Sequence, residues 1–286
     1  MTTSENEIHK YFKYEKGLRM LNNCKLTLSD AQQYNDPFEL LPASSFLPKE
    51  DLSSTKLKKL TEDPRAKSLI EDWGIEDLLQ PFGLGTIATS LLMTNPFLAL
   101  VGAGLYWGTQ TKDEKFTYKS ELEGLTIFLK QCRPIIDRAK LCCFSAEPNN
   151  ILMWAHYAQN HEGVAISFRK DAYLWNDEIF KKVEYQESRL PLPSATTDII
   201  RYVGDLMTRK ASCWTYEQEW RLIKFNAQDK MLPVNPKAIT AIRVGQRMSR
   251  EKQEKILRIR DTKYPNVPVL KASLNSYEYK IDFEQL

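Results

Sequence analysis

The order of predicted strands and helices is the feature that most constrains what this chain folds into. Apolar patterns predict strands over residues 11–14, 25–28, 140–145, 164–168, 182–186, 219–225, 239–244, 267–271 and 277–283. Helical patterns occur around residues 18–21 and over 49–77, 118–133, 152–159, 197–209 and 249–259. Strands and helices do not alternate regularly, as they do in parallel βαβ folds. We therefore expect an α+β fold with a mixed, mainly antiparallel sheet, in a single domain of residues 1–286.

Composition narrows the class of protein. A chain of 286 residues can bury a sizeable core without a disulfide or a structural metal. Its formal charge of +3 comes from basic residues mixed with acidic ones, which is no general argument for a nucleic-acid partner. The five cysteines form no Cys-x-x-Cys pair, and the polar N-terminal segment lacks the apolar core of a signal peptide. We expect reduced cysteines and a cytoplasmic protein.

Common catalytic motifs are missing from the sequence. It contains no glycine-rich phosphate loop, no Gly-x-Ser-x-Gly elbow and no zinc signature. The three histidines show neither His-x-x-x-His nor His-x-x-Glu-His spacing, so we predict no metal site. Most common hydrolases, kinases and Rossmann dehydrogenases are therefore excluded.

The sharpest catalytic signal is the segment from Trp214 to Arg221. On an extended segment, Glu217 and Glu219 point to the same face because side chains alternate along a strand. Two close carboxylates raise the pKa of one partner, which suits general acid–base chemistry or stabilisation of a cation. Arg221 continues that face and can pair with either acid. A salt-bridged strand edge has the same pattern, so the spacing alone leaves both interpretations open.

An aromatic helix carries the second candidate group. Trp154, His156 and Tyr157 lie on a predicted short helix beside a strand, where their rings can clamp a planar ligand by stacking. The spacing of Trp154 and Tyr157 equally fits the core face of a helix.

A turn over residues 34–39 carries the third group. Asn35 and Asp36 precede a proline, and such a rigid turn can hold a sugar hydroxyl or a metal, or cap the following helix. Capping leaves Glu39 without a role.

An uncharged stretch separates the two halves of the chain. No charged residue occurs between Asp77 and Lys112, and Asn95-Pro96 divides the stretch into two apolar runs. We predict an inserted, buried helical hairpin over residues 78–111. A surface for self-association, an inhibitor or a chaperone is the second interpretation. Membrane insertion is the third interpretation. A spanning helix needs ~20 apolar residues in a row, and each of the two runs has only about half that length. Beyond this insert, the helix over 118–133 is expected to stop at Pro134.

These motifs together resemble a large bacterial family, a domain of unknown function often encoded near anti-phage genes. The likeness rests on a Lys-Tyr first strand over residues 11–14 and on the Asn-Asp-Pro-Phe-Glu turn over 35–39. It also rests on the Cys-Phe-Ser, Met-Trp-x-His-Tyr-Ala and His-x-Gly-Val motifs over 143–168 and on Glu-x-Glu-Trp-Arg, which ends at Arg221.

The layout also resembles an ADP-ribosyltransferase core. Those enzymes place Arg, His or Tyr on a first strand that leads into a helix, a Ser or Tyr motif on a central strand, and a late Glu-x-Glu. The resemblance implies that Glu219 is the catalytic acid and that Glu217 orients or deprotonates the acceptor. It implies NAD as substrate, contacted by Lys13, Tyr14, Asn35, Asp36, Ser145, Trp154, His156 and Tyr157. The chain departs from that layout because its central motif is not Ser-Thr-Ser and the turn over 35–39 has no counterpart.

The first functional hypothesis is thus an NAD-consuming transferase or glycohydrolase, acting as a toxin or anti-phage defence effector on a nucleic acid or a protein. The second is a nuclease-type enzyme that uses Asp36, Glu39, Glu217 and Glu219 around Mg²⁺. The third is a sensor or interaction protein without catalytic activity.

Overall fold

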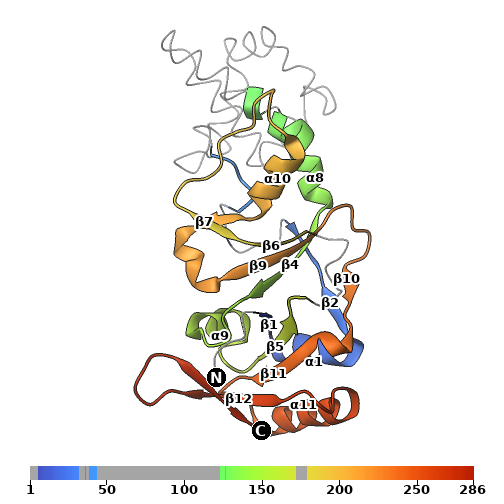
Figure 1. The fold of residues 1–286 in the computed structure, drawn as a ribbon, viewed down its shortest axis with the longest axis vertical. Helices are drawn as coiled ribbons and strands as arrows, with labels where there is room; N and C mark the ends of the chain where they lie inside the picture. The colour runs from blue at the N-terminus through green and yellow to red at the C-terminus, as the bar shows by residue number, and fades with distance from the viewer. Residues whose placement is uncertain (1–5, 32–35, 37–38, 44–122, 126, 172–178) are drawn as a thin grey trace, which may run out of the picture. The chain divides into compact units, whose positions relative to one another are not determined.

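The computed structural model describes residues 6–31, 36, 39–43, 123–125, 127–171 and 179–286 (Figure 1). The chain divides into two compact units, one of residues 1–40, 135–189 and 204–286, the other of residues 41–134 and 190–203. The apolar segment 78–111 lies outside the described residues. The helical hairpin over these residues therefore stays a prediction. The single domain of residues 1–286 also stays a prediction. Within the described ranges, no helix combines the length and apolarity that crossing a bilayer requires.

One large sheet dominates the first unit. Its strands are β1 (Glu7–Phe12), β3 (Ser29–Asp30), β4 (Lys140–Ser145), β5 (Val164–Arg169), β6 (Ile179–Lys182), β9 (Glu219–Lys224), β11 (Ile239–Val244), β12 (Val269–Leu274) and β13 (Ile281–Gln285). The spatial order is β13-β12-β11-β5-β1-β4-β9-β6, and β3 also pairs with β4. Every neighbouring pair is antiparallel except β11 and β12. The expected mixed, mainly antiparallel sheet is confirmed.

Smaller strand pairs and helices complete the described structure. β2 (Lys25–Thr27) pairs with β10 (Met231–Pro233), and β7 (Glu184–Gln186) pairs in parallel with β8 (Arg209–Ala211). The α-helices are α1 (Tyr14–Asn23), α8 (Arg133–Arg138), α9 (Ile151–Tyr157), α10 (Ile199–Met207) and α11 (Arg250–Lys263). Asn150 caps α9 by accepting from the Leu152 and Met153 amides, which explains why the helix begins there.

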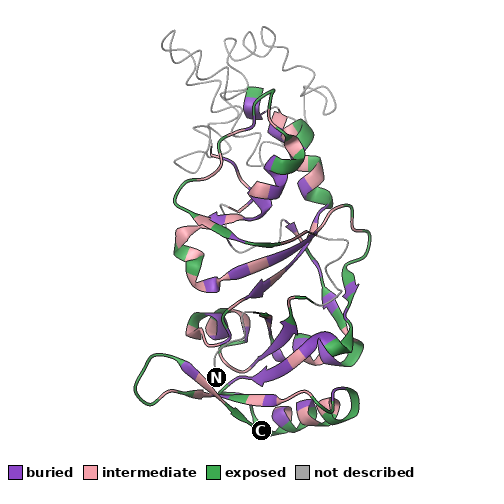
Figure 2. Cartoon of the chain, viewed as in Figure 1, coloured by how far each residue is buried: buried purple, intermediate pink, exposed green. Residues whose placement is uncertain are grey.

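The two faces of the sheet carry different side chains because successive residues of a strand alternate. On one face, Ile8, Ile166 and Leu222 belong to the main core, together with residues of α1 and α11. On the other face, Tyr11 and Ala165 pack against α9 in a smaller cluster. Figure 2 shows how completely the central strands are buried.

The contact between β1 and β4 is much shorter than those around it. These strands share a single registered pair, His9 with Ser145, whereas β4 and β9 pair from Lys140–Lys224 to Ser145–Glu219. β1 instead pairs along its whole length with β5. The sheet is therefore continuous through β1 and β4, but its backbone ladder nearly ends between them.

Some predicted boundaries are wrong. The helix does not stop at Pro134, because this residue is the second of α8, which directly follows a π-helical turn (Phe128–Cys132). The π-helical turn directly before Pro134 already shifts the backbone hydrogen bonds, as in the Arg133 amide that donates to the Phe128 carbonyl, and so accommodates a residue without an amide. The predicted strand over 11–14 is β1, which ends at Phe12. The strand over 277–283 begins only at Ile281, after a turn in which Asn275 accepts from two backbone amides.

Candidate active site

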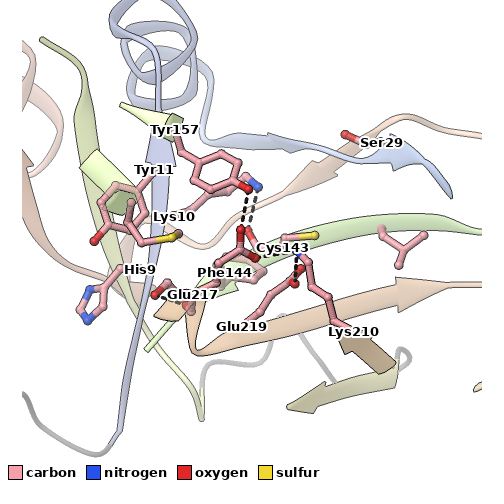
Figure 3. Close-up of a pocket in the computed structure, with 13 residues that line it drawn as sticks. His9, Lys10, Tyr11, Ser29, Cys143, Phe144, Tyr157, Lys210, Glu217 and Glu219 are labelled. Atoms are coloured by element: carbon pink, nitrogen blue, oxygen red, sulfur yellow. Dashed lines mark hydrogen bonds and ion pairs between the residues drawn. The ribbon is translucent and has the colours of Figure 1, made fainter. Parts of the chain in front are cut away.

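A cavity of about 340 Å³ opens where β1 and β4 separate. Side chains from both faces of these strands line it, including Lys10, Tyr11, Phe144 and Ser145. Further lining comes from α9 through Tyr157, from β8 through Lys210, and from Glu217 and Glu219 (Figure 3). Polar and aromatic groups thus converge on one partly open cavity, the usual character of a small-molecule site.

The two glutamates reach this cavity by a different route from the predicted one. Glu217 ends a 3₁₀ helix (Ser212–Glu217), and Glu219 begins β9. Between them Gln218 adopts a left-handed conformation with φ of 45°. The expectation of one extended segment is therefore wrong, because a left-handed residue reverses the chain direction locally. This turn still brings both carboxylates to one cavity wall.

Lys210 joins the two carboxylates. Its Nζ donates to Glu217 Oε2 at 2.6 Å and to Glu219 Oε2 at 3.3 Å. The ammonium also lies 4.8 Å from the centre of the Trp214 ring. All three charged side chains are at most 6% exposed, so each ion pair is shielded from water.

Arg221 holds Glu219 in a fixed orientation. Its Nε and Nη2 donate to the two carboxylate oxygens of Glu219, each at 2.9 Å. Its Nη1 donates to the Met207 carbonyl at 2.7 Å, and its guanidinium also pairs with Glu39. Burial by itself raises the pKa of Glu219. The charges of Arg221 and Lys210 have the larger, opposite effect, so the pKa falls to about 2. Glu219 is therefore an ionised, immobilised carboxylate at neutral pH.

Glu217 is held from the opposite side. The Tyr157 hydroxyl donates to Glu217 Oε1 at 2.6 Å, which connects α9 to the 3₁₀ helix. The Ser145 hydroxyl donates to the backbone carbonyl of Glu217 at 2.6 Å. The motif residues of β4, α9 and the Glu-x-Glu segment therefore meet in one hydrogen-bonded cluster.

A cross-strand row runs along this wall of the cavity. His9 on β1 is registered with Ser145 on β4, and Ser145 is registered with Glu219 on β9. His9 is fully buried, and its Nδ1 lies 2.8 Å from the Ser167 hydroxyl. Burial, together with the nearby charges of Arg243 and Lys170, lowers the pKa of His9 to about 3. His9 is therefore neutral at physiological pH.

Four of the predicted site residues lie together at the cavity: Ser145, Tyr157, Glu217 and Glu219. Arg221 is fully buried and does not line the cavity; it acts on Glu219. The segment proposed as catalytic and two of the predicted NAD contacts are thus spatial neighbours.

The other predicted contacts lie elsewhere. Lys13 is exposed at the start of α1, and Tyr14 is buried in the main core with Lys252 5.1 Å from its ring centre. Trp154 is fully buried, edge-on to Tyr11 at 5.4 Å. His156 is exposed and lies 3.2 Å from the Tyr216 hydroxyl.

The turn over residues 34–39 is only partly described. Asn35 lies outside the described residues, and the Asp36 carbonyl accepts from the Glu39 amide at 3.2 Å. Glu39, which capping left without a role, pairs with Arg221 deep in the sheet. Burial raises the pKa of Glu39 to about 7, although the Arg221 charge lowers it.

Sequence reasoning missed His9 and Lys10 as cavity residues. A polar pair in β1, flanked by the buried Ile8 and Tyr11, was the available signal. Such a pair has the same pattern on any half-buried strand, so only the neighbouring strands reveal its position.

The carboxylates are poorly arranged for a metal ion. Among the described residues, no group of three or more His, Cys, Asp or Glu side chains could hold one. The oxygens of Glu217 and Glu219 already accept from Lys210, Arg221 and Tyr157. A divalent cation would compete with these fixed positive charges.

Part of this site lies in a segment with known relatives. Residues 153–222 match a family model described as protein of unknown function (DUF2971). The DUF2971 match includes Tyr157, Lys210, Glu217 and Glu219, whereas His9 and Ser145 lie before it. No curated protein and no solved structure matches the chain.

Proposed function

We propose that the cavity binds NAD and cleaves the bond between nicotinamide and ribose. The observation that carries the proposal is the row of His9, Ser145 and Glu219 on three adjacent strands. It follows the layout of an ADP-ribosyltransferase: a histidine on a first strand that leads into α1, a serine on a central strand, and a late glutamate of a Glu-x-Glu pair. His9 takes the first-strand place in which sequence reasoning put Lys13 or Tyr14.

The chemistry of the cavity suits this reaction. When the glycosidic bond breaks, its electron pair leaves with nicotinamide, and the ribose carbon develops positive charge. A carboxylate that is ionised and already oriented stabilises that charge without reorganising. Glu219 meets both conditions because Arg221 binds both of its oxygens. Glu217 orients or deprotonates the group that then bonds to the ribose carbon.

The acceptor on this proposal is water, a nucleic acid or a protein. The resemblance to a family encoded near anti-phage genes favours a toxin or defence effector in the cytoplasm. The nuclease-type alternative is less well supported, because the basic residues around Glu217 and Glu219 occupy the oxygens that Mg²⁺ would need.

Nicotinamide release from NAD by the purified protein tests the proposal. We expect Glu219→Gln to lower the rate about 100-fold or more, because removing one electrostatic stabiliser costs that much. Glu284→Gln, an exposed glutamate on β13, is the matched control and should leave the rate unchanged. Circular dichroism and urea unfolding verify that both variants are folded. Equal rates in a folded Glu219→Gln variant, or release only with added divalent metal, would contradict the proposal.

A further inference from the structure

Lys10 is a cavity side chain that forms no ion pair with a described carboxylate, although the charge of Glu219 reaches its ammonium. Its Nζ donates to the Cys143 carbonyl at 2.9 Å and lies 5.7 Å and 5.5 Å from the ring centres of Phe12 and Phe144. Among the described residues, no carboxylate is within ion-pair distance of this ammonium. Lys210, the other lysine of the cavity, has two such partners. Lys10 therefore lacks the carboxylate partners that Lys210 has.

The position of Lys10 follows from the short β1–β4 ladder. The His9–Ser145 pair sets a register in which Tyr11 would lie opposite Cys143, yet no pair forms there. The Lys10 side chain instead takes the Cys143 carbonyl. The side chain thus lines the cavity beside the gap between the strands, with its ammonium held by the Cys143 carbonyl and the Cys142 thiol.

We propose that Lys10 forms an anion subsite of the cavity, which binds the pyrophosphate group of a nucleotide ligand. A cation that contacts aromatic rings, a carbonyl and a thiol is poorly solvated, and an anionic ligand would supply the ion-pair partner that it lacks. Glu217 and Glu219 do not oppose this, because Lys210 and Arg221 neutralise them. The choice of a pyrophosphate rests on the proposed NAD reaction, whereas the anion subsite itself requires no turnover.

Ligand binding without turnover tests the subsite. Isothermal titration compares ADP-ribose, adenosine and inorganic pyrophosphate on the wild-type protein, Lys10→Met and Lys10→Arg. We expect Lys10→Met to weaken ADP-ribose and pyrophosphate binding about 10-fold or more, since a charge-assisted hydrogen bond is worth that much. Adenosine, which is neutral and has no phosphate, should bind the wild-type protein and Lys10→Met equally well. Lys10→Arg should restore most of the affinity for ADP-ribose. Lys271→Met, an exposed lysine on β12, is the matched control.

A measurement on the wild-type protein guards against misfolding of the variant. Raising the salt concentration should weaken ADP-ribose binding and leave the binding of neutral adenosine nearly unchanged, because salt screens the charge of the subsite. The inference would be overturned if Lys10→Met lost ADP-ribose and adenosine binding equally, or if it bound ADP-ribose as well as the wild type does. It would also be overturned if the wild-type protein bound neither ADP-ribose nor pyrophosphate. Lys10-dependent anion binding without nicotinamide release would uphold the subsite and refute the proposed reaction.

Discussion

At the scale of single residues, the candidate site is a balance of buried charges. Glu217, Glu219 and Glu39 face Lys210 and Arg221, and each of these five side chains is almost completely shielded from solvent. Removing one member of such a cluster leaves another charge uncompensated, which costs more than the pair itself contributes. Loss of activity in any one variant must therefore be separated from loss of folding. Glu39 suits a stability experiment because its pKa is raised to about 7.

We predict that Glu39 makes the free energy of unfolding depend on pH. Burial raises its pKa from 4.5 to about 7 in the folded protein. Between these values the folded state keeps a proton that the unfolded chain has lost. The contribution of Glu39 to stability is therefore complete below about pH 4.5 and is lost as pH rises through about 7, at up to ~1.4 kcal/mol per pH unit.

Urea unfolding at about pH 5 and pH 8 measures this effect. The difference in unfolding free energy between the wild-type protein and Glu39→Gln should change between the two pH values, because only the wild type titrates at this position. All other groups titrate in both proteins and cancel. A difference that stays constant with pH would show that Glu39 titrates normally.

At the scale of secondary-structure elements, the left-handed residue Gln218 decides where the glutamates point. It separates the 3₁₀ helix from β9, and its carbonyl accepts from the Ala146 amide at 3.0 Å, next to Ser145. A continuous strand would place Glu217 and Glu219 on one face but would not bend Glu217 towards Tyr157. The turn is therefore part of the site.

We predict that substitutions at Gln218 follow backbone preference. Gln218→Gly should be neutral or stabilising by up to about 1 kcal/mol, because glycine adopts positive φ without strain. Gln218→Val should destabilise by about 1–2 kcal/mol, because a β-branched residue resists that conformation. Urea unfolding measures both. Gln285→Val, on the exposed edge strand β13, is the control, and equal effects of valine at both positions would contradict the prediction.

At the scale of the whole molecule, strand order determines which parts of the large sheet are protected. β5 lies between β1 and β11 and is buried at five of its six positions, whereas β6 and β13 end the strand order. β1 is firmly paired with β5 but meets β4 at one position only. The sheet therefore has a stable centre at β5 and a weaker junction at the cavity.

We predict a matching gradient in amide hydrogen exchange. Amides of β5 should exchange most slowly, and those of β6 and β13 should exchange at least 10-fold faster, because end strands open by local fluctuations. Exchange followed by mass spectrometry resolves these peptides. Protection of β6 equal to that of β5 would mean that the strand order differs in solution.

Local pattern predicted much of this fold. The strands over 140–145, 164–168, 219–225 and 239–244 are confirmed to within one residue at either end, because alternating or continuous apolar runs have few other solutions. Ser145, Tyr157, Glu217 and Glu219 were also selected from sequence, and the structure brings them to one cavity.

The tertiary structure alone decided which strands are neighbours, and with them the shape of the site. His9, Ser145 and Glu219 are separated by long stretches of chain, and their register follows from packing of the whole sheet rather than from local preference. Glu39 and Lys10 carry no local signal of their roles, because a buried charge is defined by the groups around it. The sequence by itself singled out the candidate residues around Trp214–Arg221; the pairing of β4 with β1 on one side and β9 on the other determined that they share a cavity.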